Sequence, residues 1–169
     1  MSQGWLPSLV LFTDAGGDWK PYLERLYAHF VADFEQTKPV WPGKRMGLKR
    51  LPEHDGKSAT FWHFISEGPE EAERYPDFRR CERIRWPRPI IDAYREIQPN
   101  PLNDRIVWWK NKRGREQRYL LALPNFSYVL VMADRGSFVL PWTAYPVERE
   151  HQRRKLVQEY HEYWLSQKG

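Results

Sequence analysis

The stretch RIVWWKNKRGREQRYLLALPNFSYVLVMADRGSFVLPWT, residues 105–143, decides the fold class. Its β-branched and aromatic residues fall into short runs separated by segments of turn-forming residues. The runs are 105–109, 117–123, 128–133 and 137–143, and the separators are 112–115, 124–125 and 134–136. Because loops this short join neighbouring antiparallel strands, the pattern predicts a four-stranded antiparallel meander.

Helical periodicity flanks this sheet on both sides. From Asp18, a plausible N-cap, apolar residues recur at the i, i+3, i+4, i+7 spacing of an amphipathic helix as far as Phe34, and Pro39 follows the end. Residues 148–166 repeat the pattern, with Leu156, Val157, Tyr160 and Trp164 as the apolar stripe. These two segments are predicted to be helices that pack on the sheet.

The region between the first helix and the sheet mixes strand and helix signals. Residues 44–51 and 58–66 have strand character and enclose an Asp55-Gly56 turn, which predicts a β-hairpin. Acidic residues at 69–73 indicate a short helical turn, and a second helix begins near Pro76. Prolines in 86–89 break the backbone before a helix over 90–97.

This order of elements predicts an α+β protein, with helices and a β-hairpin packed on a four-stranded antiparallel sheet. We expect a single domain, because no linker or repeat divides the chain. Its parts are an N-terminal loop over 1–17, a mainly helical region with the hairpin over 18–100, and the sheet with its closing helix over 101–169.

Composition narrows the class of partner. The 169 residues include 27 Lys and Arg against 22 Asp and Glu, a net charge of +5, which favours polyanionic partners.

The single cysteine, Cys81, excludes an intrachain disulfide and favours a reducing compartment, so we expect a cytoplasmic protein. No cation precedes the apolar patch 9–12, and no apolar run approaches the roughly 20 residues of a membrane span. We expect no membrane partner.

An arginine-rich segment is the first candidate binding feature. The range 77–95 carries six Arg against three acidic residues. Arginine's planar donors suit phosphate, and the alternative is a solvated helix face neutralised by its own acidic neighbours. The arginines in question are Arg79, Arg80, Arg83, Arg85 and Arg88, followed by Arg95.

The first two strands of the predicted sheet form a second basic feature. Six cations face the single acid Glu116 beside Trp108 and Trp109, a combination of phosphate attraction and stacking surface that is typical of nucleic-acid binding. Protection of an exposed sheet edge is the alternative. The cations are Arg105, Lys110, Lys112, Arg113, Arg115 and Arg118.

Histidine supplies the candidate base. His63 alternates with Phe61 and Ile65, so it is predicted to share a strand face with apolar neighbours, either as a hydrogen-bonded core residue or as a catalyst. No HExxH spacing and no cysteine ligand set occur, so we expect no metal and no cofactor. The GxxxxGK[ST], GxGxxG and GxSxG motifs of nucleotide binding and serine hydrolysis are also missing from the sequence.

Four segments carry a family resemblance, which covers about residues 45–165. They are Arg80-Cys81-Glu82-Arg83-Ile84-Arg85-Trp86-Pro87, the strand with Trp108 and Trp109, Tyr128-Val129-Leu130-Val131, and Phe138-Val139-Leu140-Pro141-Trp142-Thr143-Ala144-Tyr145. This pattern resembles the phage-associated and polymorphic-toxin nucleases of the superfamily that groups barnase, EndoU, tRNA-cleaving colicins and RelE. The resemblance implies helices followed by a four-stranded antiparallel sheet and a metal-independent ribonuclease.

The resemblance places Thr143 and Tyr145 on the terminal strand motif and Arg83 and Arg85 on the basic segment before Trp-Pro. His63 matches no motif of the family. RNA can be cleaved by its own 2′-hydroxyl when a base, an acid and cations surround the phosphate. The hypothesis is therefore an endoribonuclease of toxin or phage type that acts on RNA, tRNA included.

In this hypothesis His63 is the base, and Arg83, Arg85, Thr143 and Tyr145 complete the catalytic set. Nucleic-acid contacts are expected from Arg79, Arg80, Arg88, Trp108, Lys110, Lys112, Arg113 and Arg115. The alternatives are a non-catalytic RNA- or protein-binding module on the same scaffold, and an immunity-type protein whose basic face meets an acidic partner. A toxin would also have an antitoxin or immunity protein as its partner.

Overall fold

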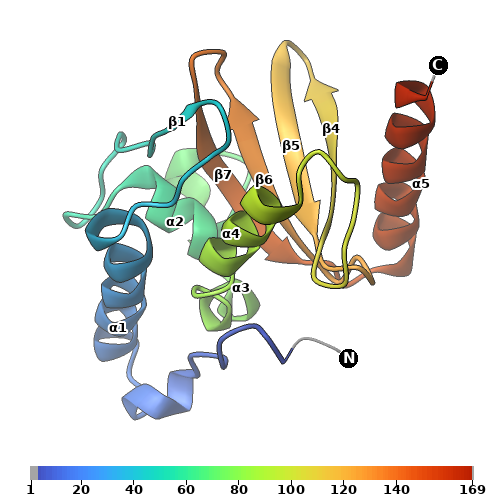
Figure 1. Cartoon of the computed structure of the whole chain (residues 1–169). Coiled ribbons are helices and arrows are strands. Elements are labelled where there is room, and N and C mark those ends of the chain that lie inside the picture. Colours follow the sequence, from blue (N-terminus) through green and yellow to red (C-terminus); the bar gives the residue numbers. More distant parts are fainter. Residues whose placement is uncertain (1–3, 169) are drawn as a thin grey trace.

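The computed structural model describes residues 4–168 and shows an α+β protein (Figure 1). The helices are α1 (Trp19–Val31), α2 (Ala59–Ile65), α3 (Phe78–Glu82), α4 (Pro87–Ile97) and α5 (Glu150–Gln167). Short turns are the 3₁₀ segments η1 (Phe12–Ala15) and η3 (Glu71–Glu73) and the π-helical η2 (Ala32–Gln36). The strands are β1 (Arg45–Met46), β2 (Ser66–Glu67), β3 (Tyr75–Pro76), β4 (Val107–Arg113), β5 (Glu116–Ala122), β6 (Tyr128–Asp134) and β7 (Phe138–Pro146).

The predicted meander is present, but the sheet that contains it has five strands in the order β1-β7-β6-β5-β4. Strands β4 to β7 are antiparallel neighbours, and Gly114 supplies the positive φ of the tight β4–β5 turn. Strand β1 adds a parallel edge through Arg45 opposite Phe138 and Met46 opposite Val139. The sheet is therefore mixed, and the expectation of four antiparallel strands is wrong at this edge.

The predicted hairpin over 44–51 and 58–66 is also wrong. Its turn forms, because His54 and Lys57 exchange backbone hydrogen bonds of 3.0 Å across Asp55 and Gly56, which have positive φ. The second arm, however, is the helix α2. The periodicity of a short run in which almost every residue is apolar cannot tell a strand from a helix. In the structure this run is a helix, and nearly all of its residues are buried.

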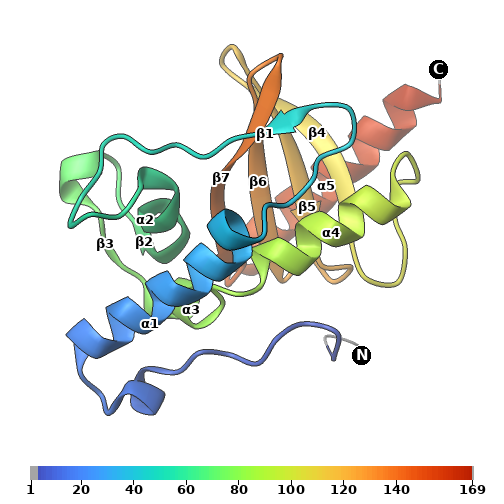
Figure 2. The same cartoon turned by 60° about the vertical axis from the view of Figure 1, so that its left-hand side comes forward.

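Helices cover the two faces of the sheet. Helices α1 and α4 lie on one face, where Phe30 and Ile90 share a core cluster with Leu121 of the sheet. Helix α5 lies on the other face and packs on β4, so that Tyr160 shares a second cluster with Trp109 (Figure 2). None of the helices in residues 4–168 is long and apolar enough to cross a membrane.

Strand β7, which lies between β6 and the two-residue β1, positions the site. Both α2 and α3 pack against it, and β2 and β3 pair to fold η3 back beside α2. A β-bulge interrupts the β6–β7 ladder: Val131 pairs with Thr143 and Met132 with Pro141, so Trp142 is the extra residue. Because a bulged residue is left unpaired in the ladder, the carbonyl of Trp142 is available to a side chain from α2.

Candidate functional site

A cavity of about 640 Å³ opens where α2, β2, η3, α3 and β7 meet. We call it the His63 cavity. Its lining combines the expected base with acidic, basic and hydroxyl side chains from several elements. They include His63, Glu67, Glu71, Arg74, Arg80, Arg113, Trp142 and Thr143.

His63 is fixed at the back of this cavity. It lies in the last turn of α2 and not on a strand, and it is 4% exposed. Its Nδ1 is 3.3 Å from the carbonyl oxygen of Trp142, the bulged residue, and its Nε2 is 2.5 Å from Oε1 of Glu71. The Glu71 side chain is half-exposed, so the pair links a buried imidazole to a carboxylate at the cavity mouth.

Opposing effects act on the protonation of His63. Burial lowers its pKa, and the positive charge of Arg74 lowers it further, whereas the hydrogen bond to Glu71 raises it. Burial is the largest of these effects, and the pKa lies below the ordinary histidine value. The 2.5 Å separation of Nε2 and Oε1 is that of a short hydrogen bond between the imidazole and the carboxylate. A buried imidazole with a carboxylate partner is an arrangement that can accept and release a proton.

Three arginines face the cavity. Arg74 donates from Nη2 to the carbonyl oxygen of Ser66 at 2.6 Å and from Nε to its hydroxyl at 3.0 Å. Arg80 donates from Nη1 to the same carbonyl at 2.8 Å. Arg113 reaches the cavity from the end of β4 and forms no ion pair within the described part of the chain. Two anchored cations and one unpaired cation therefore surround the space in front of His63.

A second carboxyl group of the cavity, that of Glu67, has a carboxyl neighbour. Glu67 lines the cavity, and Asp77 is the N-cap of α3. A hydrogen bond between the two carboxyl groups raises the pKa of Glu67, and desolvation raises it further. Glu67 therefore holds a proton more readily than an ordinary glutamate does, beside Arg80 and Arg74.

Of the two residues expected on the terminal strand motif, Thr143 lines this cavity and Tyr145 does not. Thr143 donates from its hydroxyl to the backbone oxygen of His63 at 3.4 Å and accepts from Arg80 at 3.3 Å. The guanidinium carbon of Arg80 is 5.5 Å from the ring centroid of Tyr145. Burial raises the pKa of Tyr145, which keeps its hydroxyl a donor at neutral pH. Arg80 thus connects Thr143 and Tyr145, with His63 next to them.

The other two expected catalytic residues, Arg83 and Arg85, lie elsewhere. Arg83 donates to the backbone of Arg79 and places its guanidinium 5.1 Å from the ring of Trp86. Burial lowers the pKa of His29, and the charge of Arg85 lowers it further, which puts Arg85 on the α1 side. Neither lines the His63 cavity. The cation of the basic segment that reaches His63 is Arg80, which sequence alone placed in the binding set.

Arg79 and Arg88 of that segment are bound to other parts of the protein. Arg79 forms an ion pair with Glu148 at the start of the final helical segment. Arg88 donates to Asp92 at 3.1 Å and to the backbone oxygens of Asp33 and Thr37. Local carboxylate partners were the alternative interpretation of this cluster, and the structure shows such ion pairs for Arg80 with Asp77, Arg83 with Glu82, and Arg88 with Asp92.

The basic strands β4 and β5 contribute only Arg113. Trp108 is 5% exposed and packs in the core, so its ring offers no stacking surface. The ammonium of Lys110 lies 4.8 Å from the ring centroid of Tyr119. Lys112 and Arg115 are exposed near the β4–β5 turn, outside the lining of the cavity.

Sequence reasoning missed Glu67, Glu71 and Arg74. They lie on or beside η3 and the β2–β3 pair, and this fold-back brings them to α2. The acidic run 70–73 was visible in the sequence, but it indicated a helix terminus. The signal that could have found Glu71 is its closeness to His63 in the sequence, because one short loop can bring a carboxylate eight residues away back to the imidazole.

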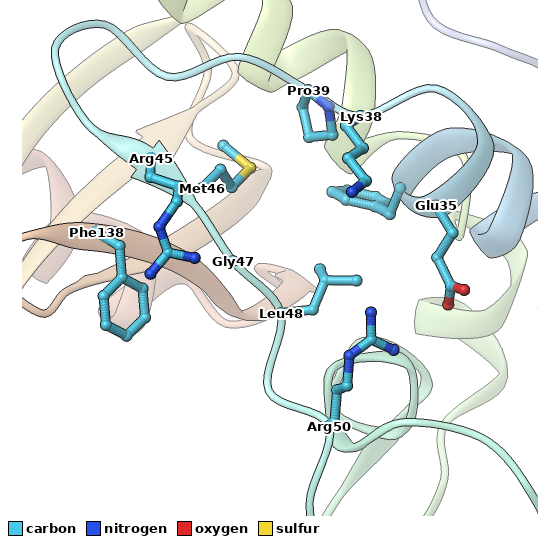
Figure 3. Close-up of a pocket in the computed structure, with 10 residues that line it drawn as sticks. Glu35, Lys38, Pro39, Arg45, Met46, Gly47, Leu48, Arg50 and Phe138 are labelled. Carbon is cyan, nitrogen blue, oxygen red and sulfur yellow. The ribbon is translucent and has the colours of Figure 1, made fainter.

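A second basic cavity lies at the opposite end of β7. We call it the Arg50 cavity; it has a volume of about 560 Å³ and is bounded by β1, η2 and the start of β7. Figure 3 shows Lys38 and Arg50 reaching into the same space beside Leu48. The guanidinium of Arg45 lies 5.2 Å from the ring centroid of Phe138. Its lining includes Glu35 but no histidine or hydroxyl group.

The chain was compared with protein-family models, with curated proteins and with solved structures, and no match was found. Within residues 4–168, no three His, Cys, Asp or Glu side chains are grouped as metal ligands. Function is therefore argued from the geometry of the chain's own residues.

Proposed function

We propose that the protein is an endoribonuclease that works without a metal and cleaves RNA through the 2′-hydroxyl, with its reactive centre in the His63 cavity. The observation that carries the proposal is the His63–Glu71 pair beside Arg74, Arg80 and Thr143 in one cavity. RNA supplies its own nucleophile, so such a centre needs a base, an acid and cations for the phosphate.

Each group has a role in this reaction. When RNA binds, the 2′-hydroxyl replaces Glu71 at Nε2 of His63, whose Nδ1–H donates to the Trp142 carbonyl, and the uncharged ring accepts the hydroxyl proton. The carboxylate of Glu71 then stabilises the imidazolium that forms. The 2′-oxygen then bonds to the adjacent phosphorus as the bond to the 5′-oxygen breaks. Glu67, whose pKa is raised by Asp77, donates the proton that the leaving 5′-oxygen requires. The products are a 2′,3′-cyclic phosphate and a 5′-hydroxyl.

The cations act on the phosphate. Negative charge grows on the phosphoryl oxygens as the fifth bond to phosphorus forms, and fixed donors stabilise this charge without reorganisation. Arg74 and Arg80 are held by Ser66, and Arg113 is unpaired within the described residues. Thr143 and Tyr145 orient Arg80 and the substrate.

The test is RNA cleavage by the purified protein. Wild type is incubated with tRNA and total RNA, with and without EDTA, and the products are separated on gels. We expect cleavage in both conditions and a loss of about 10²-fold or more in His63→Gln, the scale of a general acid–base group. His151→Gln is the matched control, because His151 is exposed on α5. Binding of RNA without cleavage would instead support the non-catalytic binding module.

A further inference from the structure

A third cavity adjoins the His63 cavity and shares Glu71 and Arg74 with it. Its volume is about 590 Å³, and its walls are rich in aromatic and proline side chains. Trp19, Trp62, Pro52 and Pro76 line it together with His54. An aromatic space thus continues directly from a space that holds cations.

The two indole rings are held in place. Trp62 donates from Nε1 to the backbone oxygen of His54 at 2.9 Å, and the His54 ring contacts it edge-on at 5.3 Å. Trp19 lies in the first turn of α1, with its ring 6.0 Å from Tyr22 and 5.9 Å from Phe78. Both rings remain partly exposed. Rigid, partly exposed aromatic rings are the platforms on which nucleobases stack.

We propose that this third cavity, which we call the indole cavity, is a nucleobase subsite for the nucleotide next to the scissile phosphate. The inference rests on the proposed ribonuclease function. A nucleotide has a phosphate at one end and a flat aromatic ring at the other. A phosphate at Arg74 and Arg80 therefore places the neighbouring base against Trp62 and Trp19, because Arg74 lines both cavities.

The Arg50 cavity does not offer this arrangement. It contains cations and the rings of Phe34 and Phe138, but its lining has no indole and shares no residue with the His63 cavity. The indole cavity also differs from the buried Trp108 and Trp109, whose rings are 5% and 0% exposed. Base recognition is thereby assigned to Trp19 and Trp62.

The experiment measures binding of two short fluorescent oligonucleotides of the same length. One is 2′-O-methyl RNA, which has no free 2′-hydroxyl and cannot be cleaved by the proposed route, and the other is its fully abasic counterpart. Wild type should bind the base-bearing probe about 10-fold more tightly or better, the scale of aromatic stacking. Trp62→Leu and Trp19→Leu should lose most of this difference and keep their affinity for the abasic probe.

Trp5→Leu is the control, because Trp5 is also partly buried but lies outside the indole cavity. It should keep the full preference for bases. Equal binding of the two probes by wild type, or an unchanged preference in both cavity variants, would overturn the subsite. Since neither probe is cleaved, base-dependent binding by a protein that fails to cut RNA would keep the subsite and reject the ribonuclease. The Leu variants keep an apolar side chain without the aromatic ring, and circular dichroism of each verifies its fold.

Discussion

The His63 cavity and the Arg50 cavity are similar in size, about 640 and 560 Å³, and both are lined by three cationic side chains. They differ in what accompanies the cations. The His63 cavity has a buried imidazole with a carboxylate partner, and it has Glu67, whose pKa is raised by its hydrogen bond to Asp77. In the lining of the Arg50 cavity, Glu35 is the one acidic side chain, and there is no histidine. Positive charge attracts phosphate, but cleavage requires groups that transfer protons.

The cavities also differ in how their cations are held. Arg74 and Arg80 are both bound to the backbone of Ser66. The side chains of Lys38, Arg45 and Arg50 form no hydrogen bond or ion pair within residues 4–168. Because an unanchored side chain loses rotamer freedom on binding, the anchored arginines stabilise a developing charge more effectively.

Removing the partner of His63 should give the largest effect. Glu71→Gln deletes the charge that shares a proton with Nε2, and we expect single-turnover RNA cleavage to fall about 10²-fold. The side chain is half-exposed, so the variant should fold. Glu70→Gln is the control, because Glu70 lines the same cavity but does not contact His63. An equal loss in both variants would show that cleavage depends on the negative charge of this loop and not on the contact between Glu71 and His63.

The pH dependence should follow His63. Burial lowers its pKa, so the ring is uncharged in a larger share of molecules at a given pH than an ordinary histidine is. Below that pKa the ring gains a proton, and the rate of wild type should fall about tenfold per pH unit. The residual activity of His63→Gln should lack this acidic limb. A rate that rises as the pH falls below 6 would contradict the assignment of His63 as the base.

Removing the unpaired cation should weaken RNA binding more modestly. Arg113→Ala deletes one phosphate contact, and the slope of log affinity against log salt should fall by about one. Arg115→Ala, on the exposed β4–β5 turn outside the cavity, should change the slope less. Titration of labelled RNA at several salt concentrations measures both slopes. Identical slopes for the two variants would place Arg113 outside the binding surface.

The smallest effect is expected in the Arg50 cavity. A double variant, Arg45→Ala with Arg50→Ala, should leave the single-turnover cleavage rate within about twofold of wild type, because neither residue transfers a proton or anchors the scissile phosphate. Rate measurements at saturating protein separate this outcome from weaker binding. A loss of about 10²-fold in the folded double variant would remove the distinction between the cavities.

Local patterns predicted the elements whose neighbours are close in sequence. The turn residues between β4 and β7 and the apolar stripe of α1 led directly to the observed elements. Strand β1 was not predictable in the same way, because two residues pair in parallel with Phe138 and Val139 far along the chain. Trp108 was taken for an exposed residue, since alternation along a strand does not show that helices cover both faces.

The candidate site was predicted in part. Residue type and a short motif pointed to His63, Thr143 and Tyr145. In the structure Thr143 contacts the backbone of His63, and Arg80 lies over the ring of Tyr145. His63 was placed on a strand, although it lies on α2. Glu71 and Arg74 depend on the pairing of β2 with β3, a tertiary contact that no local pattern encodes.

The ends of the RNA fragments produced by wild type in the presence of EDTA test the central claim most directly. Mass spectrometry of a defined RNA after cleavage identifies both ends at each cut. The account predicts a 2′,3′-cyclic phosphate or its hydrolysed monophosphate on one fragment and a 5′-hydroxyl on the other. Fragments with a 3′-hydroxyl and a 5′-phosphate, or RNA left intact once EDTA is added, would contradict it.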